Sequence, residues 1–116
     1  MPSIRELLAR KCTHTEVALS DAEISSYLSA VPDWALADNH IIKAYKFKNY
    51  YETLAFINAI AYVIHAEDHH PEIKLTYNQC VIKFDTHTVN SGSGGVSEND
   101  FICAAKVDAI YQQSFS

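Results

Sequence analysis

Four of the six histidines fall in two short stretches of the chain and are the side chains best suited to chemistry. His65, His69 and His70 lie within one six-residue stretch, and His87 follows a later apolar stretch. Imidazoles titrate near neutral pH, so one ring can donate a proton while another accepts one. This pattern predicts general acid–base catalysis, such as a dehydration. The other two histidines stand apart and are expected to be surface residues: His14 and His40.

The same histidines leave a zinc site open as a rival interpretation. His65 and His69 are four residues apart, so on a helix they would point the same way, as zinc ligands do. The zinc-protease motif places a glutamate directly after the first histidine, whereas this chain has Ala66 there. Cys80 lies on a neighbouring predicted strand, but the sequence does not fix its orientation. Acid–base chemistry without a metal is therefore the favoured prediction.

A long helix over residues 50–67 is predicted to carry the first histidines. Asn49 begins a capping signature, and apolar residues recur on one face of the segment that follows. Pro71 disfavours helical backbone at the residue before it. The helix must therefore end nearby, with His69 and His70 at its exit.

The remaining pattern predicts two hairpins and two further helices. A capping box indicates a helix over 20–30, and alternation predicts strands over 34–37, 40–47, 73–77 and 81–87. His87 would close the last of these strands, and a third capping signature, at Ser97, begins the final helix. Hairpins pair antiparallel and helices cover one face of the sheet, so the fold class is α+β. Residues 1–19 give no clear assignment.

Length and composition narrow the class of protein. The 116 residues are predicted to form one domain, 1–116, with 1–19 as a variable N-terminal segment. The net charge of -5 disfavours direct nucleic-acid binding. Charges interrupt the start before a signal peptide could form, and no apolar run approaches the roughly 20 residues that span a bilayer. The three cysteines are odd in number and far apart, which indicates reduced thiols and a cytoplasmic protein.

These residues, at these spacings, resemble the signature of the pterin-4a-carbinolamine dehydratases. The matching string is His65, His69, His70, Pro71, Tyr77, His87 and Asp100, within a resemblance that runs from about residue 34 to the last helix. It implies a four-stranded antiparallel sheet with helices packed on one face, a homodimer or dimer of dimers, and no cofactor. The implied reaction removes water from a 4a-hydroxytetrahydropterin to give quinonoid dihydropterin. Such a reaction recycles the pterin used by aromatic amino-acid hydroxylases.

The resemblance also implies roles for individual residues. His69, His70 and His87 match the family's three active-site histidines, with His69 and His87 expected as the acid–base pair and His70 as the residue that positions the pterin. Which of the pair is the acid stays open. The neighbouring residues are expected to contact the substrate: Asp68, Pro71 and His65.

One departure from the family pattern affects the expected activity. The family has a carboxylate four residues before the first histidine, where this chain has His65. Glu67 or Asp68 could replace that carboxylate sterically. We therefore expect activity with a shifted pH optimum, and a loop between His87 and Asp100 that is longer than in the shortest members.

A second function is implied by animal relatives, which also act as a dimerisation cofactor for a homeodomain transcription factor. One fold can host both roles. The alternative to catalysis is therefore a protein-binding dimerisation cofactor or transcriptional coactivator. A binding protein could lose its histidines and still work, so their presence favours the enzyme.

Overall fold

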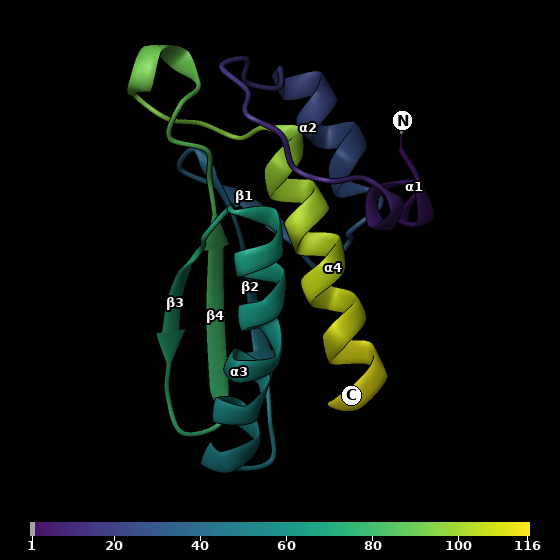
Figure 1. The fold of residues 1–116 in the computed structure, drawn as a ribbon, viewed down its shortest axis with the longest axis vertical. Coiled ribbons are helices and arrows are strands. Elements are labelled where there is room, and N and C mark those ends of the chain that lie inside the picture. Colours follow the sequence, from purple (N-terminus) through teal and green to yellow (C-terminus); the bar gives the residue numbers. More distant parts are fainter. Residues whose placement is uncertain (1) are drawn as a thin grey trace.

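Two β-hairpins lie side by side in one antiparallel sheet, with the strands in the order β1-β2-β4-β3 (Figure 1). The structure is a computed structural model and describes residues 2–116. The strands are β1 (Ala35–Ala37), β2 (His40–Lys46), β3 (Glu72–Leu75) and β4 (Gln79–Phe84). The first hairpin turns at Asp38 and Asn39, whose positive φ values of 46° and 54° suit a two-residue hairpin loop.

Helices pack against one face of this sheet (Figure 1). They are α1 (Ile4–Ala9), α2 (Asp21–Leu28), α3 (Tyr50–Glu67) and α4 (Glu98–Ser114), with a short 3-10 turn η1 (Asn90–Gly92). Capping side chains begin the three longer helices at the predicted residues: Ser20, Asn49 and Ser97. No helix among residues 2–116 is long and apolar enough to cross a membrane.

The core lies between the sheet and the two long helices. Along β4, Cys80, Ile82 and Phe84 are fully buried and alternate with partly exposed residues, as one covered sheet face requires. The Tyr45 ring of β2 lies 4.8 Å from the Phe56 ring of α3 and 4.9 Å from that of Tyr111 in α4. The predicted α+β class, a four-stranded antiparallel sheet with helices on one face, is confirmed.

The prediction that His87 closes the last strand is wrong. β4 ends at Phe84, which pairs with Ile41 at the far end of the β2 ladder. The pairing of β4 with β2 ends at this pair and its pairing with β3 ends at Lys83, and the segment beyond makes an isolated bridge between Thr86 and Gly95. His87 therefore lies on an irregular segment just past the sheet.

Other elements differ from the prediction in smaller ways. β3 ends at Leu75, before the predicted residue 77, because the backbone N–H of Thr76 donates to the carbonyl of Gln79 and starts the turn there. The unassigned N-terminal region contains α1, capped by Ser3, followed by residues 10–19 without helix or strand. We call residues 10–19 the strap, because they run from α1 past the beginning of α4 to α2 (Figure 1).

One polar cluster sits inside the aromatic core, centred on Asp108 of α4. Its carboxylate accepts hydrogen bonds from Trp34 Nε1 at 3.1 Å, from Lys43 Nζ at 2.8 Å and from the Tyr45 hydroxyl. Burial, with Asp108 as a further cause, raises the pKa of Tyr45, so its hydroxyl remains a donor. The cluster links β2 to α4 through an ion pair in which the Lys43 side chain is only 10% exposed.

We predict that Asp108→Ala lowers the free energy of unfolding by about 3 kcal/mol, because it leaves a mostly buried lysine charge without its partner. Asp33→Ala is the matched control, since Asp33 lies 3.8 Å from the same Lys43 Nζ but is 75% exposed. Its loss should stay below about 1 kcal/mol. Urea denaturation measures both, and equal losses for the two variants would contradict the structural role of Asp108.

Candidate active site

The exit of α3 directs two histidines out of the helix. Asp68 caps the helix in a left-handed conformation, with φ 51° and ψ 43°, and its backbone N–H donates to the carbonyls of Ile64 and His65. An aspartate tolerates this conformation better than most residues. The chain therefore turns sharply at Asp68, and the next two residues, His69 and His70, leave the helix axis.

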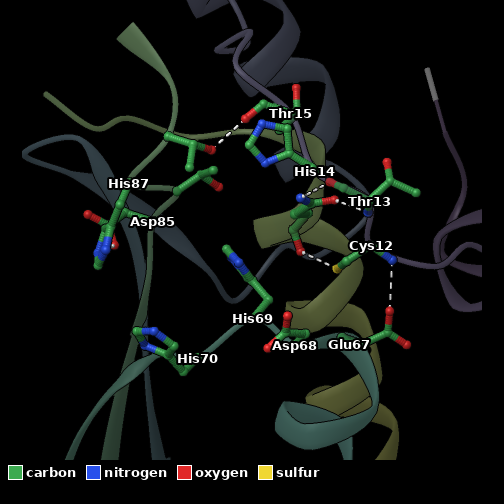
Figure 2. A pocket seen from close by; sticks show the side chains of 13 residues that line it. Cys12, Thr13, His14, Thr15, Glu67, Asp68, His69, His70, Asp85 and His87 are labelled. Carbon is green, nitrogen blue, oxygen red and sulfur yellow. Dashed lines mark hydrogen bonds and ion pairs between the residues drawn. The ribbon is translucent and has the colours of Figure 1, made fainter. Parts of the chain in front are cut away.

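These histidines border a cavity of about 330 Å³ beside the end of β4 (Figure 2). Its lining comes from residues 12–15, 67–70 and 85–88, together with Asn99 of α4. His69, His70 and His87 all belong to this lining, and the rings of His70 and His87 lie 5.9 Å apart, nearly edge to face. The cavity falls within the lower range of small-molecule pockets.

His69 is the most firmly held of the three. Its Nε2 lies 2.6 Å from Asp100 Oδ1, and its ring stacks parallel to Phe84 with 5.8 Å between centroids. A carboxylate only accepts hydrogen bonds, so Nε2 of His69 carries the hydrogen. The side chain is 13% exposed, and the carboxylate and the Phe84 ring together hold the imidazole in one orientation.

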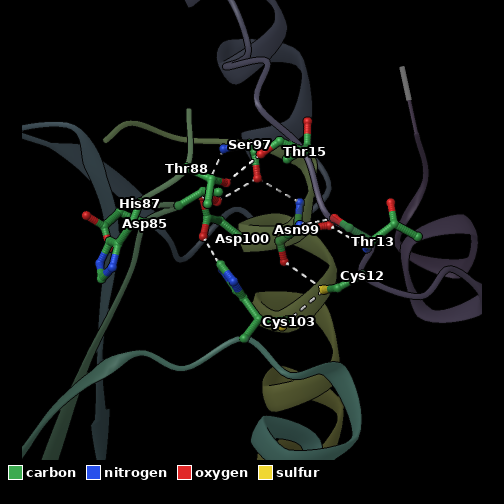
Figure 3. A network of polar contacts seen from close by, with 12 residues as sticks. Cys12, Thr13, Thr15, Asp85, His87, Thr88, Ser97, Asn99, Asp100 and Cys103 are labelled. Carbon is green, nitrogen blue, oxygen red and sulfur yellow. Dashed lines mark hydrogen bonds and ion pairs between the residues drawn. The ribbon is translucent and has the colours of Figure 1, made fainter. Parts of the chain in front are cut away.

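Asp100 joins this site to the start of α4. Its second oxygen, Oδ2, accepts from the Thr86 hydroxyl and from the backbone N–H of Ser97, each at 2.9 Å (Figure 3). The sequence identified Ser97 and Asp100 as a helix capping signature, which is confirmed, but gave no sign that the same carboxylate also holds His69. That second role depends on a contact across 31 residues.

The structure contradicts the suggestion that Glu67 or Asp68 takes the place of the missing family carboxylate. Neither side chain meets His69, which is bound by Asp100. Glu67 instead accepts from the backbone N–H of Cys12 at 2.7 Å and from Lys106 Nζ at 2.6 Å. Asp68 is exposed and lines the cavity. The carboxylate that meets His69 comes from α4, which the sequence pattern around residue 65 could not reveal.

His87 and His70 are much less constrained than His69. His87 is 70% exposed, and its Nε2 lies 3.2 Å from Asp85 Oδ1. His70 is also exposed. The site thus combines one imidazole in a fixed orientation with two that meet solvent.

Two of the predicted substrate contacts lie outside the cavity lining, and one unexpected histidine lies within it. His65 is exposed on α3 and Pro71 begins the approach to β3, and neither lines the cavity. Their role as substrate contacts stays a prediction. His14, expected to be a surface residue, is 69% exposed but belongs to the lining (Figure 2).

The strap forms one wall of the cavity and is tied down by polar contacts. Thr13 and Asn99 exchange two hydrogen bonds, at 3.2 and 2.7 Å, and the Thr88 hydroxyl donates to the carbonyl of Thr15. These contacts join segments that are more than 70 residues apart. Sequence reasoning missed this wall, because residues 10–19 carry neither helical nor strand periodicity.

The described residues do not provide a set of ligands for a metal ion. Across residues 2–116 there is no group of three or more His, Cys, Asp and Glu side chains placed to bind one. Cys80, which the zinc interpretation invoked, is fully buried in β4. The arrangement favours proton transfer to and from a small polar molecule.

Comparisons with known proteins agree with this picture. A family model described as pterin 4 alpha carbinolamine dehydratase matches residues 17–110. A protein of Bdellovibrio bacteriovorus with the provisional name pterin-4-alpha-carbinolamine dehydratase is 53% identical over 116 residues, covering 100% of this chain and 97% of the relative. A similarly named protein of Nitrosomonas eutropha is 47% identical over 114 residues, covering 95% and 97%.

A solved structure shares the fold. It is described as a transcriptional coactivator/pterin dehydratase from Brucella melitensis, with a TM-score of 0.72 and 32% sequence identity. The match covers 80% of this chain and 97% of that chain. The family match includes the three histidines and Asp100, whereas the cavity-lining part of the strap, residues 12–15, precedes it.

We predict that Asp100→Asn changes the tautomer of His69. The backbone N–H of Ser97 requires an oxygen opposite it, so the new amide nitrogen must face His69 Nε2. That ring nitrogen then has to accept, and the hydrogen moves to Nδ1. The ¹⁵N NMR shifts of the ring report the change. Asp85→Asn, beside His87, is the control and should leave His69 as in wild type; an unchanged tautomer in Asp100→Asn would contradict the assignment.

We also predict that Glu67 makes stability depend on pH. Burial raises the pKa of Glu67, but the Cys12 N–H and Lys106 outweigh burial, so its pKa lies below the ordinary value. Its contribution is therefore present above the unfolded pKa of about 4.3 and is lost as pH falls through the lower folded value. Wild type and Glu67→Gln should differ in unfolding midpoint at pH 7 and converge at acid pH.

The control for Glu67 is Glu72→Gln, which removes an exposed carboxylate 3.4 Å from Lys83 Nζ. Its effect on the midpoint should be small at both pH values. The unfolding midpoints of wild type and Glu67→Gln could instead differ by the same amount at pH 7 and at acid pH. That result would show that the charge of Glu67 contributes nothing to stability.

Proposed function

This chain belongs to the pterin-4-alpha-carbinolamine dehydratase family, and we propose that it removes water from a 4a-hydroxytetrahydropterin to give quinonoid dihydropterin. Family membership supports the reaction class. The observation that carries the proposal is the group of imidazoles of His69, His70 and His87 around one cavity. The proposed chemistry is general acid–base catalysis by these histidines.

The reaction needs two proton transfers. The C4a–O bond breaks, the oxygen takes up a proton and leaves as water, and N5 loses its proton as the C4a–N5 double bond forms. One group must therefore act as acid at the oxygen and another as base at N5. No net proton is gained or lost, so the enzyme can return to its starting state through solvent.

The surroundings of the histidines support an assignment of the two roles. His69 has Nε2–H bound to the buried carboxylate of Asp100, which leaves Nδ1 to accept the N5 proton. Asp100 would stabilise the resulting imidazolium, as a buried carboxylate does for a catalytic histidine elsewhere. His87 is exposed, so it can deliver a proton to the leaving oxygen and regain one from water. His70, beside His87, would position the pterin.

The proposal extends to the setting of the reaction. We infer a role in recycling the pterin cofactor of an aromatic amino-acid hydroxylase, without a metal or organic cofactor of its own. We also propose that the protein assembles as a homodimer or dimer of dimers and that it is cytoplasmic. The odd number and wide spacing of the three cysteines in the sequence support a reducing compartment.

The alternative is a protein-binding role as a dimerisation cofactor or transcriptional coactivator. The description of the Brucella melitensis structure names a coactivator together with a pterin dehydratase. A coactivator role would not depend on the imidazoles, so histidine variants separate the two functions.

We predict that His69→Ala and His87→Ala each slow the enzyme-dependent decay of 4a-hydroxytetrahydropterin by about 100-fold or more, because each removes one proton-transfer group. The measurement is stopped-flow absorbance with purified protein. His40→Ala is the control, since His40 lies at the start of β2 and outside the cavity lining. It should retain wild-type activity. A wild-type protein that leaves the uncatalysed decay unchanged would end the catalytic proposal.

A further inference from the structure

Two thiols from opposite ends of the chain meet beside the cavity. Cys12 of the strap and Cys103 of α4 lie with their sulfur atoms 3.5 Å apart, although 91 residues separate them (Figure 3). The Cys12 sulfur also lies 3.5 Å from the carbonyl oxygen of Asn99. Because Cys12 donates its S–H to this carbonyl, Cys103 is the thiol that donates its S–H to the Cys12 sulfur.

The geometry requires only a small movement to form a disulfide. A disulfide has a sulfur–sulfur distance of about 2.05 Å, so the two atoms must approach by about 1.5 Å. Cys103 lies within a long helix, but Cys12 belongs to the strap, which has no helix or strand to resist a shift. The strap is therefore the element that moves.

The two thiols differ in access to solvent, which assigns them different roles. Cys12 is partly exposed and lines the cavity, so a small oxidant can reach it. Cys103 is fully buried, and its pKa is raised, first by the hydrogen bond with Cys12 and then by burial. Cys103 thus keeps its hydrogen, while the accessible Cys12 is the thiol that reacts first.

The third cysteine provides an internal reference. Cys80 is fully buried in β4, and burial raises its pKa to about 11. Among residues 2–116, no other cysteine sulfur is found close to that of Cys80, whereas the sulfur atoms of Cys12 and Cys103 form a close pair. A general reactivity of cysteines in this protein would therefore affect Cys80 as well.

We propose that Cys12 and Cys103 are an oxidative modification site, in which hydrogen peroxide converts the two thiols into an intramolecular disulfide. The Cys12 thiolate attacks one peroxide oxygen and the O–O bond breaks, which gives a sulfenic acid and hydroxide. The Cys103 sulfur then loses its proton and attacks the Cys12 sulfur, so that the S–O bond breaks and hydroxide leaves. The two released hydroxides take up the two thiol protons. Two thiols and one peroxide thus give one disulfide and two waters.

The disulfide would tie the strap covalently to α4 next to the candidate active site. Thr13 and His14, which follow Cys12 directly, belong to the cavity lining. The noncovalent attachment of the strap through Asn99 would then be reinforced by a bond one helical turn along α4. This site is independent of the dehydratase proposal, because the chemistry uses none of the histidines.

The test counts free thiols after peroxide treatment of the folded, reduced protein. Samples are denatured in excess N-ethylmaleimide, which labels each free thiol, and the mass of the labelled protein is measured by mass spectrometry. Wild type should fall from three labelled cysteines to one, and Cys80→Ser from two to none. Peptide mapping should recover residues 12 and 103 in one cross-linked peptide, and dithiothreitol should restore the label.

Two variants test the order of the steps. Cys103→Ser should stop at a Cys12 sulfenic acid that dimedone traps, and Cys12→Ser should slow the loss of the Cys103 thiol by more than about tenfold. Circular dichroism confirms that each variant is folded, and reduced glutathione in the same solution confirms that the peroxide is active. Wild type that keeps three labelled thiols would overturn the proposal. Disulfides only between molecules, or loss of the Cys103 thiol in Cys12→Ser at the wild-type rate, would also overturn it.

Discussion

The buried carboxylate of Asp100 is the constraint on which the site depends. A charged group that is fully shielded from water is costly unless its oxygens are hydrogen-bonded. Asp100 meets this requirement with partners from three segments: Ser97 at the start of α4, Thr86 just past β4, and His69 at the exit of α3. A backbone bridge between Thr86 and Gly95 joins the first two of these segments, and the Asp100 carboxylate connects the exit of α3 to them. The Asp100 side chain therefore connects the three segments and also orients His69, a candidate catalytic residue.

The contrast between held and exposed imidazoles follows from that constraint. His69 is fixed by the carboxylate and by the parallel ring of Phe84, so the nitrogen that the proposed mechanism uses would be oriented before a substrate binds. His87 lies beside Asp85 and the ring of His70 and is largely in water. A base must hold its position and gain stabilisation when charged, whereas an acid has to be reprotonated after each turnover. The difference in burial between the two rings suits this division of labour.

The sequence predicted what local physics determines. The capping residues Ser20, Asn49 and Ser97 and the period of the 50–67 segment are short-range signals, and the helices that they predict appeared at or near their expected bounds. The end of β4 was misplaced because strand ends depend on where the neighbouring strands stop, which is a tertiary property. The partner of His69 was missed for the same reason: the helix-capping role of Asp100 is visible in sequence, but its contact with the α3 exit arises only in the folded chain.

The strap shows most clearly where local reasoning stops. Its residues have no periodicity, and contacts with distant segments hold it in place, among them Cys12 to Glu67 and Cys103, Thr13 to Asn99, and Thr15 to Thr88. The family match begins at residue 17 and includes the histidines and Asp100, so the proposed proton-transfer groups belong to the shared part of the fold. The wall formed by residues 12–15 lies outside that match. A wall held by side-chain hydrogen bonds can shift without disturbing the sheet or the helices, because none of its contacts belongs to their backbone ladders. The strap can therefore alter one wall of the cavity while the segments that carry the candidate histidines keep their places.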